Sequence, residues 1–220
     1  IETHKPDPTI EKKYDFVYVC TRADWNITNP DDSSCNDWTS INKNWELAKK
    51  CLPILCGKKE QGGFDLKGIL VGRQGCKLPP GIKDNVTLTY NMDHSDLMKI
   101  FKESRFMFLP NKHDASPRII TEAMCFDLPI LINKNIVGGW KYATPSTGMS
   151  FTDENDISQS LDILLKNMDR LTPRQHIIKH YGPVNSSRKL LRFLKAHFSH
   201  RIKDIEDLQY LHHPRWKPNN

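Results

Sequence analysis

Two acidic residues, Asp114 and Glu122, are separated by seven residues and flank an expected helix start. Ser116 can cap that helix through its hydroxyl, and Pro117 suits the first helical position because its missing N–H would have no partner there. The unpaired N–H groups and the dipole of a helix N-terminus favour an anion such as phosphate. Carboxylates beside an anion site suggest that the other part of the ligand carries hydroxyl groups.

A simpler explanation of the same residues needs no ligand. Arg118 and Glu122 are four residues apart and can form an exposed ion pair worth about 0.3 kcal/mol, with Asp114 as a solvated loop residue. The strands and helices around the segment favour the ligand site, because a helix N-terminus that follows a parallel strand is a natural place for phosphate.

The segment lies between two short apolar runs of strand length, residues 105–110 and 128–132. Other runs of strand length occupy residues 14–20, 64–71, 85–90 and 148–151. Apolar residues at helical spacing occupy residues 40–55, 95–103, 156–166, 173–181 and 184–198. Strands that alternate with helices, without hairpin dipeptides, predict right-handed crossovers. We therefore expect an α/β fold, a Rossmann-like parallel sheet with helices on both faces, followed by extra C-terminal helices.

Three regions are expected along the 220 residues. Residues 1–13, with two prolines among charges, indicate a linker, residues 14–167 the Rossmann-like domain, and residues 168–220 a helical extension. The formal net charge is +6, and basic residues are dense after Arg170. No nucleic-acid-binding motif accompanies them, so a basic surface for an anionic acceptor, a membrane surface or a second domain is favoured over nucleic acid.

The acidic pair with seven intervening residues, followed by Ala-Met and by a Leu-Pro that opens a strand, resembles the E-x7-E signature of retaining glycosyltransferase family four, group 1. The resemblance covers about residues 15–167 and implies the C-terminal, donor-binding half of a GT-B type enzyme. It implies that Glu122 holds the ribose of a nucleotide-sugar and that Asp114 contacts the sugar or its diphosphate. Asp114 replaces the usual Glu, and Ala115 replaces the usual Gly after it.

The same resemblance implies that Arg22 and Lys43 face the diphosphate, where two cations would neutralise the leaving group. About twenty residues separate them, where the family has a handful. Arg118, near the helix start, is a further candidate for this role. Arg22 and Lys43 can each also be explained as a solvated surface residue.

The segment that holds Met92 and Asp93 aligns with the family segment that contacts the nucleobase. Asp93 could accept a hydrogen bond from a guanine edge, although an Asp before a helix is more often a cap. Gly72 lies in a turn that resembles the family's Gly-rich turn after the second strand, and a tight turn alone also explains it.

The resemblance implies a transferase that moves a sugar, with retention, from a GDP- or UDP-sugar to an acceptor glycan, protein or lipid, without a bound metal. An N-terminal acceptor domain or a partner chain would complete it, and peripheral membrane contact is a further expectation. The alternative is a non-catalytic nucleotide-sugar-binding or scaffold module, which the Asp at position 114 and the long interval from Arg22 to Lys43 would favour. A basic protein that acts on nucleic acid is a second rival.

Six cysteines occur at irregular positions without a CxxC pair, and several fall in expected strands or helices. We therefore expect reduced, buried thiols and a cytoplasmic location. Three Asn-x-Ser/Thr triplets begin at Asn26, Asn85 and Asn185, but such triplets arise often by chance. No run of about 18 apolar residues is present.

Overall fold

The computed structural model describes residues 4–114 and 117–198. The chain forms two compact units, Ile1–Arg174 and Gln175–Asn220.

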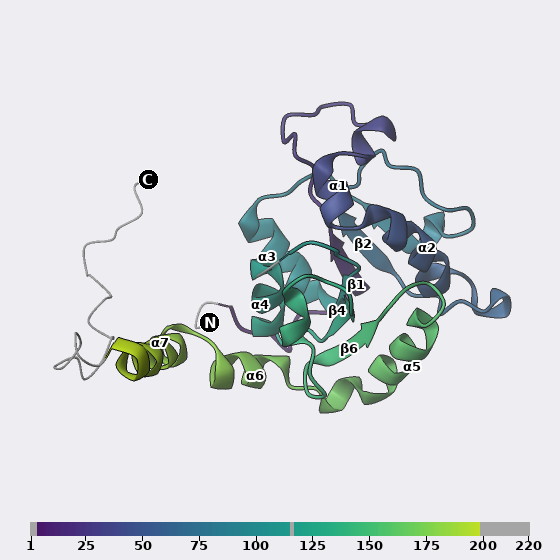
Figure 1. The fold of residues 1–220 in the computed structure, drawn as a ribbon. Helices are drawn as coiled ribbons and strands as arrows, with labels where there is room; N and C mark the ends of the chain where they lie inside the picture. The colour runs from purple at the N-terminus through teal and green to yellow at the C-terminus, as the bar shows by residue number, and fades with distance from the viewer. Residues whose placement is uncertain (1–3, 115–116, 199–220) are drawn as a thin grey trace. The chain divides into compact units, whose positions relative to one another are not determined.

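A six-stranded parallel sheet forms the centre of the first unit (Figure 1). Its strands are β1 (Tyr14–Val19), β2 (Gly68–Val71), β3 (Val86–Leu88), β4 (Ser104–Leu109), β5 (Ile130–Asn133) and β6 (Gly148–Phe151). Their spatial order is β3-β2-β1-β4-β5-β6, and in the register Val17 lies opposite Ile69 on one side and Met107 on the other. The chain thus reverses its direction of travel across the sheet between β1 and β4, as in a doubly wound Rossmann fold.

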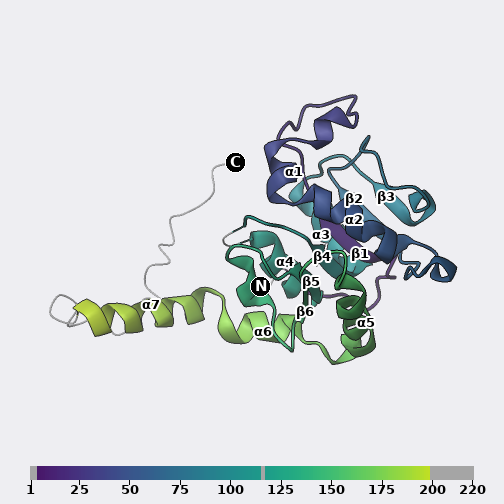
Figure 2. The same cartoon turned by 45° about the vertical axis from the view of Figure 1, so that its right-hand side comes forward.

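Helices cover both faces of this sheet, as expected from the sequence (Figures 1 and 2). They are α2 (Trp45–Cys56), α3 (His94–Glu103), α4 (Arg118–Cys125) and α5 (Ile157–Asn167), and the short helix α1 (Trp38–Asn42) lies in the connection between β1 and α2. Short 3₁₀ turns lie at Ser33–Cys35, Lys59–Gln61, Lys83–Asn85, Gly139–Tyr142 and Met168–Arg170. On the face covered by α2 and α5, the core joins Phe16 and Phe108 to Leu52 and Leu161. Helices α3 and α4 cover the opposite face.

Two expected elements differ from those observed. The helix expected at residues 40–55 is interrupted at Asn44, which has φ 56° and donates from its side-chain amide to the carbonyl of Pro110. The strand expected at residues 64–71 begins only at Gly68, because the N–H groups of Phe64 and Leu66 donate to carbonyls at the end of α2.

The second unit contains most of α6 (Pro173–His180) and all of α7 (Pro183–Phe198). The side chain of Asn185 donates to the carbonyls of Ile178, Lys179 and Tyr181, so it satisfies acceptors at the end of α6. The amphipathic pattern expected after residue 201 lies outside the described residues. In the part of the chain that is described, no helix is long and apolar enough to cross a membrane.

The expectation of reduced thiols is wrong for two of the cysteines. Cys35 and Cys76 form a disulfide between residues 41 apart in sequence, tying the loop that follows β1 to the turn that follows β2. The remaining cysteines are free and buried. Burial raises the pKa of Cys51 and of Cys56 to about 12, so these thiols are inert. The disulfide could not be predicted from the sequence, because its two cysteines come together only when the connections that follow β1 and β2 fold against each other.

Candidate functional site

A cavity of about 490 Å³ opens beyond the carboxyl ends of β1 and β4. This is the point at which the strand order reverses, where open parallel sheets bind ligands. Its lining residues are Val19, Thr21, Trp25, Lys43, Met92, His94, Leu97, Asp114, Pro117, Arg118, Ile119 and Glu122. Six of the residues proposed from the sequence therefore line one cavity, although they come from three separate segments.

Lys43 and Asp114 form an ion pair in this cavity, with 2.7 Å between Lys43 Nζ and Asp114 Oδ2. The left-handed conformation of Asn44 ends α1 and turns the chain into α2, with Lys43 as the last residue before it. The N–H groups of Lys112 and His113 donate to the carbonyl of Asn42, which holds the loop after β4 beside the end of α1. These backbone contacts fix the cation and the carboxylate next to each other.

Glu122 and His94 form a second polar pair on the cavity wall, with 3.4 Å between His94 Nε2 and Glu122 Oε1. Glu122 lies on α4 and His94 begins α3, so neighbouring helices bring them together. The side chain of Glu122 is 27% exposed, which leaves its carboxylate open to a ligand hydroxyl. Helix α4 begins at Arg118, with Pro117 as its N-cap and not its first helical residue as expected. The capping role expected for Ser116 lies outside the described residues.

Arg22 does not line the cavity, contrary to the position expected for a phosphate ligand. Its guanidinium is buried at 3% exposure and donates to the carbonyls of Ser34 and Gln74. It also lies within 3.3 Å of both sulfurs of the Cys35–Cys76 disulfide. The phosphate role of Arg22 therefore has no support in the geometry, because the loop tied by the disulfide holds the side chain. Lys43 and Arg118 are the cations that line the cavity.

Asp93 caps α3, accepting from the N–H of Asp96 at 2.9 Å and from the hydroxyl of Ser95. These hydrogen bonds lower the pKa of Asp93. The cap alternative is confirmed, and the base contact stays a prediction. Met92 lines the cavity, whereas Gly72, with φ 82°, shapes the adjoining turn without lining it.

Six lining residues are not among those proposed as site residues: Val19, Thr21, Trp25, His94, Leu97 and Ile119. His94 belongs to the segment that aligns with the family's base-contacting segment. Trp25 is 60% exposed and stands in the long polar loop between β1 and α1. An exposed tryptophan in a polar loop was the one available signal for it. Asp37 supports this loop by accepting from the N–H of Ala23 at 2.7 Å and from Ser40. Burial alone would raise the pKa of Asp37, but these hydrogen bonds outweigh it and lower the pKa to about 2.

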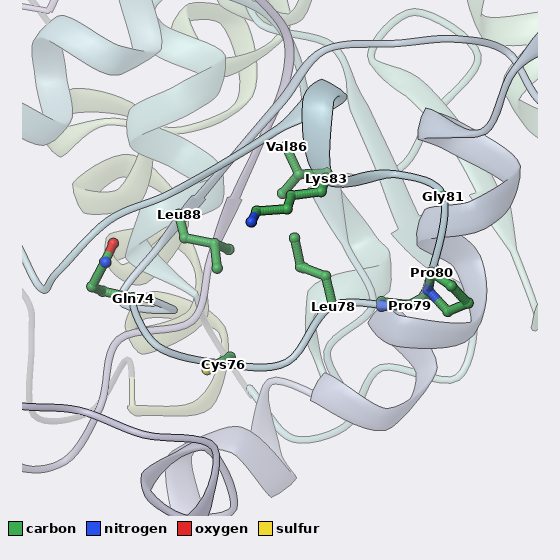
Figure 3. A pocket seen from close by; sticks show the side chains of 9 residues that line it. All are labelled: Gln74, Cys76, Leu78, Pro79, Pro80, Gly81, Lys83, Val86 and Leu88. Carbon is green, nitrogen blue, oxygen red and sulfur yellow. The ribbon is translucent and has the colours of Figure 1, made fainter.

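A second cavity, of about 560 Å³, lies along the edge strand β3 (Figure 3). Prolines, Leu78, Val86 and Leu88 form much of its wall, and Lys83 is its charged residue. It contains no carboxylate and none of the residues proposed from the sequence. Within the described residues, no group of three or more His, Cys, Asp or Glu side chains could hold a metal ion.

No protein-family model matches the sequence, and no curated protein is similar to it in sequence. Solved structures are similar in fold. Sucrose-phosphate synthase from Thermosynechococcus elongatus superposes with a TM-score of 0.56 at 14% identity, over 87% of this chain and 47% of that one. The C-terminal domain of a glycosyl transferase group 1 family protein, LpcC from Francisella tularensis, gives a TM-score of 0.55 at 11% identity, over 81% of this chain and 95% of that one.

A third neighbour is the lipopolysaccharide outer core galactosyltransferase WaaB, with a TM-score of 0.56 at 15% identity, over 89% of this chain and 52% of that one. The chain thus spans about half the length of two of these structures and nearly all of the isolated C-terminal domain. The six-stranded parallel sheet with helices on both faces therefore has the fold of the C-terminal domain of a GT-B, group 1 glycosyltransferase, the fold expected from the sequence.

Proposed function

We propose that this chain is the donor-binding domain of a glycosyltransferase. It binds a GDP- or UDP-sugar, and the sugar passes with retention to an acceptor glycan, protein or lipid. A second domain or chain supplies the acceptor side. The cavity at the sheet reversal carries the proposal, because Lys43, Asp114, Arg118 and Glu122 converge there.

The polar groups of the cavity match the parts of such a donor. Glu122 is open enough to accept hydrogen bonds from both hydroxyls of a ribose. Lys43 and Arg118 supply positive charge for the diphosphate, and α4 begins at the same wall. As the glycosidic bond breaks, negative charge grows on the diphosphate, so cations fixed beside it stabilise the transition state more than the bound donor.

Asp114 has a separate part in this proposal. Asp114 Oδ2 lies 2.7 Å from Lys43 Nζ, so the carboxylate positions the ammonium group before a donor arrives. The same carboxylate can then accept from a hydroxyl of the transferred sugar. No step requires a metal ion, since the protein's own cations face the diphosphate.

Calorimetric titration with UDP and with GDP tests the proposal. We expect Glu122→Ala to weaken nucleotide binding at least tenfold, about 1.4 kcal/mol, because the ribose hydroxyls lose their acceptor. Glu46→Ala is the matched control, since Glu46 is an exposed glutamate on α2 that does not line the cavity.

Two outcomes contradict parts of the proposal. If both variants bind nucleotide as tightly as the unaltered protein, the cavity is not the donor site. Tight nucleotide binding without donor hydrolysis or transfer by the full-length protein would instead favour the non-catalytic module.

A further inference from the structure

The three Asn-x-Ser/Thr triplets of the sequence differ in what the folded chain does with their asparagine side chains. The amide nitrogen of Asn85 donates to the carbonyl of Cys56 at 2.9 Å and to Asp65 at 2.7 Å. That of Asn185, within α7, donates to three carbonyls at 3.0–3.1 Å. A glycan on either nitrogen would replace one of its two N–H donors and so break at least one of these contacts.

Asn26 is different, because it lies exposed in the loop between β1 and α1. Its backbone N–H donates to Asp24 Oδ1 at 2.8 Å, which forms a local turn. No described residue bonds its side-chain amide, and Thr28, whose hydroxyl completes the triplet, is also exposed. A glycan at Asn26 would therefore project from a surface turn without disturbing the fold.

The Cys35–Cys76 disulfide anchors the same loop, nine residues after Asn26. Both cysteines are buried, at 1% and 5% exposure, so the bond belongs to the packed structure and is not an exposed redox pair. Disulfides of this structural kind form in oxidising compartments and are rare in the cytosol. Asparagine-linked glycans are characteristic of secreted and luminal proteins, so the two features point to the same surroundings.

We propose that Asn26 carries an N-linked glycan and that this domain folds in an oxidising lumen. In the modification, the amide nitrogen of Asn26 bonds to the anomeric carbon of an oligosaccharide carried on a lipid diphosphate. The bond from that carbon to the diphosphate oxygen breaks, the lipid diphosphate leaves, and the amide loses one proton. This proposal replaces the cytoplasmic expectation and is independent of the proposed donor site.

The protein isolated from its natural source provides the direct test. Release of N-linked glycans by an amidase in heavy-oxygen water converts a glycosylated Asn to a marked Asp. We expect the mark at Asn26 and at neither Asn85 nor Asn185. An unmarked Asn26, or a mark at Asn85, would overturn the proposal.

The full chain secreted from a eukaryotic cell supplies the matched variants. Thr28→Ala removes the acceptor triplet while leaving Asn26 in place, and we expect it to abolish the glycosidase-sensitive shift in mobility. Thr28→Ser keeps a hydroxyl and should keep the shift. Thr87→Ala, which removes the Asn85 triplet without altering the Asn85 side chain, is the control and should leave the shift unchanged. Persistence of the full shift in Thr28→Ala would refute the assignment.

Thiol counting on the protein isolated from its natural source tests the compartment separately. Alkylation of the denatured, unreduced chain should label Cys20, Cys51, Cys56 and Cys125, with Cys35 and Cys76 labelled only after reduction. Labelling of Cys35 and Cys76 without reduction would overturn the oxidising part of the proposal.

Discussion

Reduction of the Cys35–Cys76 disulfide should destabilise the first unit strongly. The bond closes a loop between residues 41 apart in sequence. In the chain-entropy model, such a cross-link removes about 13 cal/mol/K from the unfolded ensemble, which is about 4 kcal/mol at 25 °C. Measured values are commonly lower, so we expect a loss of about 2–4 kcal/mol in the free energy of unfolding.

Urea unfolding followed by tryptophan fluorescence measures this loss. With a slope of about 2 kcal/mol per molar urea, the midpoint of the oxidised chain should lie about 1–2 M above that of the reduced chain. Comparing the two redox forms of one sequence keeps both buried sulfurs in place, so the difference reports the cross-link alone. The variant Cys35→Ala/Cys76→Ala should unfold at the same urea concentration with and without reductant.

Coincident midpoints for the oxidised and reduced unaltered chain would refute this reasoning. So would a dependence of the double variant on reductant, since the remaining cysteines are free thiols. Coincident midpoints would mean that other contacts, such as those of Asp37 and Arg22, order the loop after β1.

Two further perturbations test the supports of the cavity. Gly72→Ala should lower the free energy of unfolding, measured by thermal denaturation, by about 2–4 kcal/mol, because a Cβ would lie 2.6 Å from the carbonyl oxygen of Cys20. Gly62 has the same φ of 82° but no atom within 4 Å of the position that a Cβ would take, so Gly62→Ala should lower it by only about 1 kcal/mol. Equal losses in the two variants would contradict the steric argument. Asp37→Asn keeps a helix cap but loses the charge, so at neutral pH it should cost about 1 kcal/mol after allowance for solvent screening. Because folding lowers the pKa of Asp37 from 3.8 to about 2, this stabilisation is complete above about pH 4 and is lost as the pH falls through 2. If the unfolding free energies of the unaltered chain and of Asp37→Asn differ by the same amount at every pH, the charge of Asp37 is not the cause.

Much of the fold followed from short-range patterns. Apolar runs bounded by turn residues located all six strands, and the alternation with helices gave a parallel sheet with both faces covered. The predicted ends of helices and strands were wrong where a group distant in sequence forms hydrogen bonds with the segment. Asn44 interrupts the helix expected at residues 40–55 by donating to Pro110, which is 66 residues away.

Part of the candidate site could also be predicted from the sequence. Pro117 and Glu122 belong to one helix and its cap, which local spacing indicates, whereas Lys43 and Asp114 were proposed from the family resemblance. Thr21 and Trp25 were missed, because only the tertiary structure places the loop after β1 beside α3 and α4. Arg22 lies away from the cavity, and nothing local indicates that a disulfide-bound loop holds its guanidinium.

The sequence by itself therefore determined the element types, their order and the acidic pair around one helix, since these depend on residue spacing within a few turns of chain. Only the tertiary structure decided which cation meets Asp114, which two cysteines pair and which asparagine stays open to solvent. Each of these choices depends on groups brought together from distant segments by the crossovers of the sheet, and no local pattern encodes such distances.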